Sequence, residues 1–344
     1  MSSNQKIIVQ PDIKSGAHRS VPQREHFAII PFLRLLRWPN LLIIFFTQAA
    51  VWWCVIQPLG EGSLVLDRYH FLFLTASTVA IAAAGYLIND YFDIRIDAVN
   101  HPEKFILEKK IHRRIAIILH SALNALGLLL ALIVARRSGS LWPVLVPIVC
   151  TTLLWFYSTH FKQRFMVGNV VVAILTALAV LILLFYEPAL LRLFPSPALT
   201  SDLDTRTIVN PAYIVAGYAY FAFVLTWMRE IVKDMEDIRG DSAERCDTMP
   251  IRWGLLRSCR FTQVLGILAV APLLYGALRL VLAGTQTLPL GLYLFAAVTI
   301  PLSVWTLRLT AKATTKHYSR ASRGLKIIMV LGVGFLFLYR YGYA

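Results

Sequence analysis

Nine long apolar segments constrain the fold of this chain more than any other feature. They cover residues 38–58, 70–90, 114–135, 141–159, 167–187, 211–230, 261–282, 288–307 and 324–341. Most approach or exceed the roughly 20 residues that a helix needs to cross a bilayer. With 57% hydrophobic and 15% charged residues, the chain is too apolar for a soluble domain, in which about 25% of residues are charged. The sequence therefore predicts an all-α, polytopic membrane bundle.

The basic residues predict the orientation of this bundle. If the N-terminus lies inside, 27 of the 34 Lys and Arg residues fall in inner segments or at the span ends beside them. Such a bias is typical of cytoplasmic loops. The net charge of +15 therefore indicates contact with anionic lipid, and no nucleic-acid partner is predicted. Residues 1–34 lack a secretory signal and are predicted to be a polar, basic cytoplasmic tail. Residues 35–344 are predicted to form one transmembrane domain in a bacterial or archaeal cell membrane.

One acidic pattern, Asp-x-x-Asp-x-x-x-Asp, occurs twice and always directly after an apolar segment. The two copies are Asp90, Asp93 and Asp97, and Asp234, Asp237 and Asp241. On a helix this spacing keeps three carboxylates within roughly 60° of arc. Carboxylates packed so closely repel one another, and a divalent cation relieves the repulsion. Mg²⁺ takes one or two carboxylates together with substrate phosphate oxygens, and Asn89 offers a neutral oxygen ligand.

The predicted orientation places both acidic copies on the cytoplasmic face. Solvated loop carboxylates are the alternative interpretation, but two matching copies on one face favour a shared site for a metal-bound diphosphate. Nearby cations suit the remaining phosphate charge, namely Arg95, Lys104, Lys162, Arg164, Arg229 and Lys233. Positive-inside topology also accounts for such cations, and it is the preferred interpretation for Arg164 alone. Asn40, Tyr157 and Asn169 lie in or beside apolar segments, where a substrate role and a helix-packing role are equally favoured.

Several motifs together resemble the UbiA superfamily of intramembrane prenyltransferases. The first acidic copy continues as Asp97-Ala-Val-Asn100-His-Pro102-Glu-Lys104, similar to that family's D-x-x-N-x-P-x-R with Lys in place of Arg. Asp237-x-x-x-Asp241 resembles the second aspartate motif. Further matches are Arg37-Trp-Pro39-Asn40, the segment with Tyr157, Lys162, Gly168 and Asn169, and the segment with Thr248, Pro250 and Gly254.

The resemblance implies nine transmembrane helices around a central cavity, with a cytoplasmic cap that carries both motifs. It also implies Mg²⁺-dependent transfer of an isoprenyl group, expected to be geranylgeranyl, from its diphosphate to a membrane-soluble acceptor. Asp93, Asp237 and Asp241 would be catalytic; these three and Asn89, Asp90, Asp97 and Asp234 would hold Mg²⁺. The implied substrate-binding residues are Asn40, Arg95, Lys104, Tyr157, Lys162, Asn169, Arg229 and Lys233.

The second motif is most similar to the branch that prenylates geranylgeranylglyceryl phosphate, and is shared in part with enzymes that prenylate aromatic acceptors such as homogentisate. Both acceptor classes stay open at this point. A cation-coupled transporter and a non-catalytic lipid-binding protein are the other classes considered. Transporters place ionisable groups near the membrane midplane, whereas these acids follow the ends of apolar segments.

Overall fold

The computed structural model describes residues 32–33, 35–60, 64–94, 112–194, 209–243, 245–311 and 314–343. Within these ranges the chain forms helices and no strand, and nine helices are long and apolar enough to cross a membrane. The all-α architecture and the number of spans predicted from the sequence are thereby confirmed. Most of the predicted tail, residues 1–34, lies outside the described residues, as do Arg95, Asp97 and Lys104.

The nine spans follow one another along the chain, and several contain short turns of 3-10 or π geometry. They are α2 (Trp38–Val51) with Trp52–Leu59, α3 (Arg68–Phe92), α5 (Arg113–Arg137), α6 (Leu145–Phe156) with Trp142–Val144 before it and Tyr157–Phe161 after it, α7 (Val167–Tyr186), α10 (Pro211–Ala243), α11 (Met249–Leu282), α12 (Leu288–Tyr293) running through Leu294–Thr299 into α13 (Ile300–Arg308), and α14 (Thr315–Tyr343). A short helix, α8 (Pro188–Leu191), follows α7.

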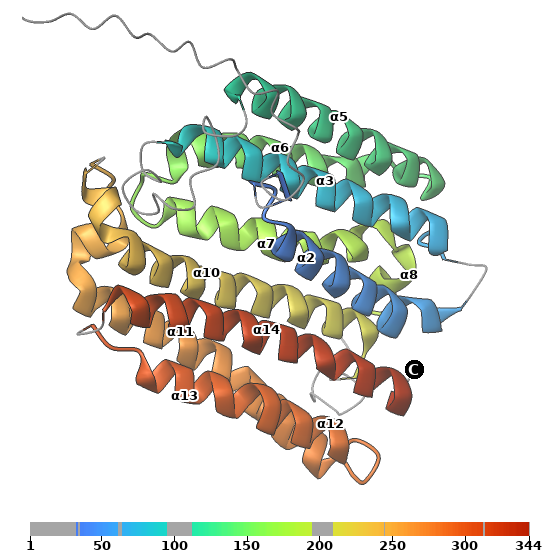
Figure 1. Ribbon diagram of the computed structural model, residues 1–344. Helices are drawn as coiled ribbons and strands as arrows, with labels where there is room; N and C mark the ends of the chain where they lie inside the picture. Colours follow the sequence, from blue (N-terminus) through green and yellow to red (C-terminus); the bar gives the residue numbers. More distant parts are fainter. Residues whose placement is uncertain are drawn as a thin grey trace, which may run out of the picture.

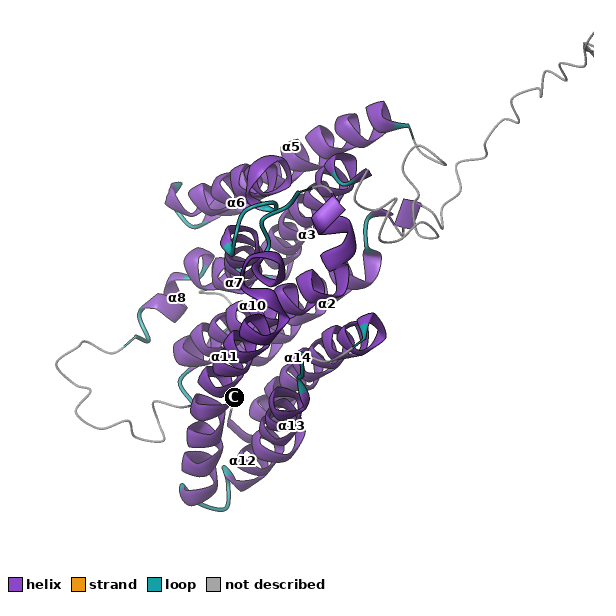
Figure 2. Ribbon diagram, turned by 90° about the vertical axis from the view of Figure 1, so that its left-hand side faces the viewer, coloured by secondary structure: helices purple, strands orange, loops and turns teal. Residues whose placement is uncertain are grey.

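Six of these helices form a closed ring. Helix α2 packs on α3, α3 on α6, α6 on α7, α7 on α10, α10 on α14, and α14 again on α2. The other spans lie outside the ring: α5 covers α3 on one side, while α11, α12 and α13 cover α10 and α14 on the other (Figures 1 and 2). The ring therefore surrounds the space in which a central cavity can form.

The end of the ring near Tyr186 is closed by a hydrophobic core. Trp52–Ile56, the start of α3 and the ends of α5, α7 and α14 meet there around the fully buried side chains of Leu66, Leu183 and Tyr186. Large apolar side chains on the outer surface stay exposed, such as Leu307 and Ile267. In a soluble monomer so much exposed apolar surface would be unusual, whereas lipid covers it in a membrane protein.

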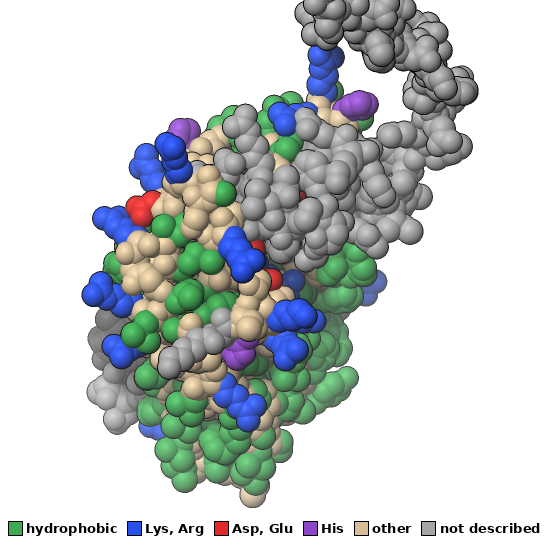
Figure 3. Space-filling view, turned by 60° about the vertical axis from the view of Figure 1, so that its left-hand side comes forward, with side chains coloured by type: hydrophobic (Ala, Val, Ile, Leu, Met, Phe, Trp, Pro, Cys, Tyr) green, Lys and Arg blue, Asp and Glu red, His purple; other side chains and the backbone are tan. Residues whose placement is uncertain are grey.

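Three helices extend past the predicted spans at the opposite end. Helix α10 continues to Ala243 instead of ending near residue 230, α11 begins at Met249, and α14 begins at Thr315. A hydropathy window ends where charged residues begin, but a helix continues as long as its backbone bonds and packing are satisfied. Lys and Arg side chains gather on this end, with a few acidic atoms visible between them (Figure 3). The second acidic copy thus lies on a helical extension rather than in a loop.

A side-chain cap fixes the start of α3. Asp67 accepts hydrogen bonds from the backbone N–H groups of Tyr69 and His70, at 2.9 and 3.0 Å. It therefore satisfies two of the amides that the first helical turn leaves without an intrahelical partner. From this start α3 runs unbroken to Phe92, which carries Asn89 and Asp90 to the open end of the ring.

Candidate active site

The ring encloses a cavity of about 850 Å³ that opens at the end with the acidic residues. Polar side chains concentrate near the opening, and apolar side chains line the deeper part. Every described residue among the predicted site residues lines this cavity: Asn40, Asn89, Asp90, Asp93, Tyr157, Lys162, Asn169, Arg229, Lys233, Asp234, Asp237 and Asp241. The structure therefore brings together residues from α2, α3, α7, α10 and the turn after α6.

Asp90 and Asp93, the described residues of the first acidic copy, are held at the end of α3. Because α3 ends at Phe92, Asp93 does not continue the helical stripe that the spacing predicts. Asp93 is the C-cap residue of the helix, and only 4% of it is exposed. Its carboxylate accepts hydrogen bonds from the Asn89 amide, at 2.6 Å, and from the Lys162 ammonium. Lys162 directly follows the π-helical turn Tyr157–Phe161, so that turn positions the cation opposite Asp93.

Arg37 holds the neighbouring carboxylate. Its guanidinium lies 2.7 Å from Asp90. Burial disfavours the charged guanidinium, but the carboxylates of Asp90 and Asp93 outweigh burial and raise the pKa of Arg37 above its ordinary value. Arg37 adopts a left-handed backbone conformation with φ 51°, which few residues other than glycine adopt. Arg37 is the residue directly before α2, and its side chain lines the cavity.

The second acidic copy lies along one stripe of α10, as the spacing predicts. Asp234, Asp237 and Asp241 all line the cavity, and Asp241 is buried. The Asn169 amide on α7 donates a 2.8 Å hydrogen bond to Asp234. Asp234 is therefore already partnered by a protein donor, and Asn169 tethers the two adjacent helices of the ring.

The acidic end of the cavity fits Mg²⁺ in the presence of a phosphate-bearing ligand. The Asn89 side-chain oxygen is buried and receives no hydrogen bond from any described residue. The amide nitrogen, and not this oxygen, is the atom that bonds Asp93. A buried oxygen without a donor suits a cation. No group of three or more His, Cys, Asp or Glu within the described ranges is arranged to hold a metal by itself. Mg²⁺ needs no such cage, since it commonly combines one or two carboxylates with phosphate oxygens and water.

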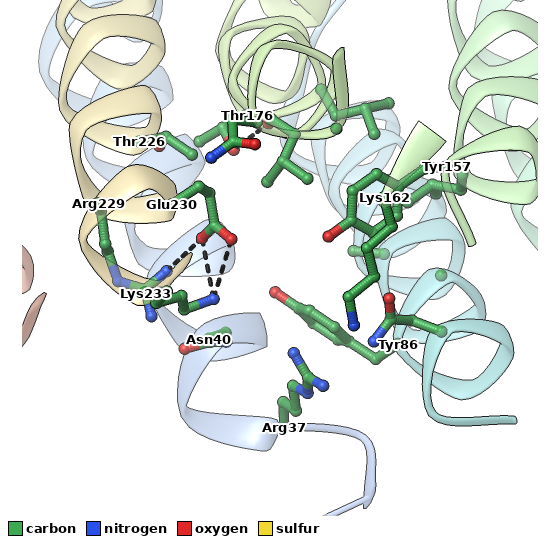
Figure 4. Close-up of a pocket in the computed structure, with 18 of the residues that line it drawn as sticks. Arg37, Asn40, Tyr86, Tyr157, Lys162, Thr176, Thr226, Arg229, Glu230 and Lys233 are labelled. Carbon is green, nitrogen blue, oxygen red and sulfur yellow. Dashed lines mark hydrogen bonds and ion pairs between the residues drawn. The ribbon is translucent and has the colours of Figure 1, made fainter. Parts of the chain in front are cut away.

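A second polar group lies deeper on the α10 side of the cavity, and it is basic. Glu230 accepts hydrogen bonds from Arg229 at 2.8 Å and from Lys233 at 2.9 and 3.1 Å. Lys326 on α14 donates to the Asn40 side-chain oxygen on α2. Figure 4 shows Glu230 and Lys233 on one side of the open space, and Tyr157 and Lys162 on the other.

The deep part of the cavity is an apolar chamber. On α7 its wall runs from Asn169 to Ile182, a length of about 20 Å at the helical rise of 1.5 Å per residue. The hydroxyls of Tyr86 and Tyr157 face the same open space as Glu230 and Lys233 (Figure 4). A chamber of this length suits an extended chain of several isoprene units.

Among the cavity residues that were not predicted as site residues are Arg37, Tyr86, Glu230 and Lys326, and the sequence carries a signal for three of these four. Glu230 and Lys326 are ionisable groups inside apolar segments, which are costly in a membrane and therefore mark functional sites. Arg37 belongs to the motif that contains Asn40. Tyr86 has no distinguishing signal, because a tyrosine in an apolar segment is ordinary.

Comparison with known sequences gives a consistent result. The sequence model of the UbiA prenyltransferase family matches residues 49–323. Digeranylgeranylglyceryl phosphate synthase of Methanothermobacter thermautotrophicus is 32% identical over 281 residues, which cover 78% of this chain and 85% of that protein. The synthase of the same name from Saccharolobus solfataricus is 30% identical over 279 residues, which cover 79% of this chain and 87% of that protein.

Solved structures share the fold. A structure reported for digeranylgeranylglyceryl phosphate synthase in membranes superposes with a TM-score of 0.60 and 24% identity, and covers 91% of this chain and 98% of that one. A UbiA homologue from Archaeoglobus fulgidus, bound to GPP and Mg²⁺, superposes with a TM-score of 0.55 and 17% identity, and covers 90% of this chain and 99% of that one. At these identities the likeness concerns the arrangement of the helices.

Proposed function

The chain belongs to the UbiA prenyltransferase family, and we propose that it transfers a geranylgeranyl group from its diphosphate to a membrane-soluble glyceryl phosphate lipid. The acceptor class comes from the curated relatives named as digeranylgeranylglyceryl phosphate synthases. A protein of this family whose described residues include nine apolar spans is an integral, multi-pass membrane protein.

One observation carries the proposal: two aspartate motifs meet at the mouth of a cavity whose deep part is apolar. A prenyl diphosphate has the same division, with a charged head and an apolar tail. Its head would lie between the end of α3 and the extension of α10, and its tail would lie along the chamber wall formed by α7. Since the tail is as apolar as lipid, a membrane bundle is a suitable place for this reaction.

In the proposed reaction the allylic C–O bond breaks and the diphosphate leaves with the electron pair. Bound Mg²⁺, held by Asn89, Asp90, Asp93, Asp237 and Asp241, would neutralise charge that develops on the diphosphate. Lys162 is positioned beside Asp93 to add countercharge from the chain itself. Asp97, Arg95 and Lys104, to which the resemblance assigns metal or substrate binding, lie outside the described residues.

The other residues would orient the partners and delay attack by water. Tyr157 offers an aromatic ring close to the reacting carbon, and the chamber wall excludes solvent from the prenyl cation. A hydroxyl oxygen of the acceptor would then form the new C–O bond and release its proton. Asn169 would act indirectly, because it holds Asp234 and keeps α7 next to α10.

The direct test uses purified protein in detergent with Mg²⁺, geranylgeranyl diphosphate and geranylgeranylglyceryl phosphate. We expect diphosphate release and a doubly prenylated glyceryl phosphate in the mass spectrum. Asp93→Ala and Asp237→Ala should each abolish both signals while the protein still inserts and elutes as one species. In a parallel assay homogentisate replaces the glyceryl phosphate lipid, and product formation with homogentisate alone would show that the acceptor is aromatic. Full turnover in both variants would contradict the proposed active site.

We also propose that the N-terminus and both aspartate motifs face the cytoplasm. Support comes from the Lys and Arg side chains gathered at the end of the molecule where the cavity opens (Figure 3). In a variant without the four native cysteines, Lys316→Cys should react with a membrane-impermeant maleimide in inverted vesicles and stay unlabelled in intact cells. The opposite labelling pattern would reverse the orientation.

A further inference from the structure

The basic side chains on the α10 side of the cavity are not explained by the diphosphate site. We infer that Arg229, Lys233 and Lys326 form a second anion site, which binds the phosphate of the acceptor lipid without a metal. This inference rests on the proposed function, because it assigns the acceptor headgroup to a place in the same cavity.

The charges of this basic group do not balance. Arg229 and Lys233 share one carboxylate, that of Glu230. Among the described residues, Lys326 bonds a neutral amide oxygen, that of Asn40, and no carboxylate. Taken together, these side chains carry three positive charges and one negative charge in a largely buried place, where charges interact more strongly than in water. A phosphate monoester carries a charge of about −1.5 to −2 at pH 7, so it would neutralise this excess.

The group also has a donor without a partner. The Nε–H of Arg229 is buried and makes no hydrogen bond within the part of the chain that the structure describes. A buried donor without a partner costs free energy, and a phosphate oxygen would relieve that cost. Glu230 holds the Arg229 and Lys233 side chains in place from within one turn of α10, so the site is already shaped in the absence of a ligand.

The two ends of the polar cavity differ in sign, and this difference separates the two ligands. The end with Asp237 and Asp241 is acidic, so it can accept a diphosphate only together with metal ions. The end with Arg229 and Lys326 is basic, so it can accept a phosphate directly. From Glu230 to Asp237 the separation along α10 is about 10 Å at 1.5 Å per residue. That spacing leaves room for the glycerol hydroxyl of an acceptor between its own phosphate and the leaving diphosphate.

The test measures lipid binding rather than turnover. The probes are a hexadecyl glyceryl ether that bears a phosphate and the same ether without the phosphate, each titrated into purified protein with EDTA present. We expect the wild-type protein to bind the phosphate-bearing ether at least tenfold more tightly. Lys326→Met should remove this preference, and Lys326→Arg should restore most of it. In the presence of Mg²⁺, the Kd for geranylgeranyl diphosphate should change less than twofold in both variants.

Lys316→Met is the matched control, because Lys316 is an exposed lysine on the same helix and does not line the cavity. If Lys326→Met proves unstable, Lys326→Gln tests the same charge with a polar side chain. Equal wild-type affinity for the two ethers would overturn the inference. An equal loss of affinity for the ether phosphate and for the prenyl diphosphate would also overturn it, because the cations would then belong to the donor site. These binding results are independent of product formation, so they stay distinct from a failure of the proposed reaction.

Discussion

The substitution Gly168→Ala should impair catalysis through backbone displacement alone. Gly168 lies near the start of α7, where that helix passes directly over the turn that carries Lys162. A Cβ atom on residue 168 would lie 2.9 Å from the Lys162 Cα and 3.0 Å from the Phe161 carbonyl oxygen. Carbon atoms in good contact are about 3.5–4.0 Å apart, so the Lys162 backbone would have to move by roughly 0.5–1 Å.

The size of the effect follows from that displacement. Overpacking of this kind costs about 1–3 kcal/mol of stability. A shift of about 1 Å in a positioning group can cost roughly a hundredfold in rate. Because Lys162 bonds Asp93, we expect the turnover number for diphosphate release to fall about ten- to a hundredfold in Gly168→Ala.

The assay is continuous diphosphate release at saturating substrates, with the melting temperature measured on the same sample. Gly217→Ala is the matched control, because Gly217 lies within α10 and a Cβ atom there would have no neighbour within 4 Å. It should keep wild-type turnover and melt slightly higher, since alanine favours a helix interior over glycine. Wild-type turnover in Gly168→Ala, at unchanged melting temperature, would refute the close approach of α7 to the Lys162 turn.

Three further predictions concern other parts of the bundle. Asp67→Ala removes the cap of α3 and should lower the free energy of unfolding by about 1 kcal/mol. Thermal melting in detergent measures this loss, with Asp67→Asn as the control because it keeps an accepting oxygen. Equal losses of stability in both variants would contradict the cap. Glu187 lies just beyond α7, accepts a hydrogen bond from the Leu66 N–H at 2.9 Å, and has a pKa raised by burial above the ordinary 4.5. Since the folded state holds this proton more tightly, its stabilising effect is present below pH 4.5 and is lost as pH rises through the folded pKa. As the pH rises from 4.5 through the folded pKa of Glu187, the melting temperature of Glu187→Gln should therefore increase relative to that of the wild type, and above this range the difference should stay constant. A melting-temperature difference that does not depend on pH would contradict the burial of an ionisable carboxyl. Ala179 lines the deep end of the chamber, so Ala179→Phe should shift the preferred donor from geranylgeranyl to geranyl diphosphate in competition assays; an unchanged ratio of products would place the tail elsewhere.

Much of the site was predictable because its chemistry is local in sequence. The spacing of Asp234, Asp237 and Asp241 places them on one stripe of a helix wherever that helix lies, and the structure has that stripe facing the cavity. The metal-binding assignment of these residues stays a prediction, as do the roles of Arg95, Asp97 and Lys104. The end of the sixth span was predicted too early, because hydropathy reports the polarity of a segment and not the continuity of its backbone hydrogen bonds.

The pairing of the cations was beyond prediction from sequence motifs. Arg229 and Lys233 were both predicted to contact phosphate, yet the structure separates them from Lys162 and joins them to Glu230. This division depends on which helices are neighbours in the ring. Nothing in the local sequence of α10 indicates that it faces α14 on one side and α7 on the other.

The sequence by itself determined the membrane class, the number of spans found among the described residues and the acidic stripe of α10, because hydropathy and helical periodicity are properties of short segments. Only the tertiary structure decided that the two groups of acidic residues share a cavity and which charges meet in it. Lys326 and Asn40 are 286 positions apart along the chain and are hydrogen-bonded in the fold. Their contact exists because α14 closes the ring against α2, and the packing of six helices around one space is a property of the whole chain.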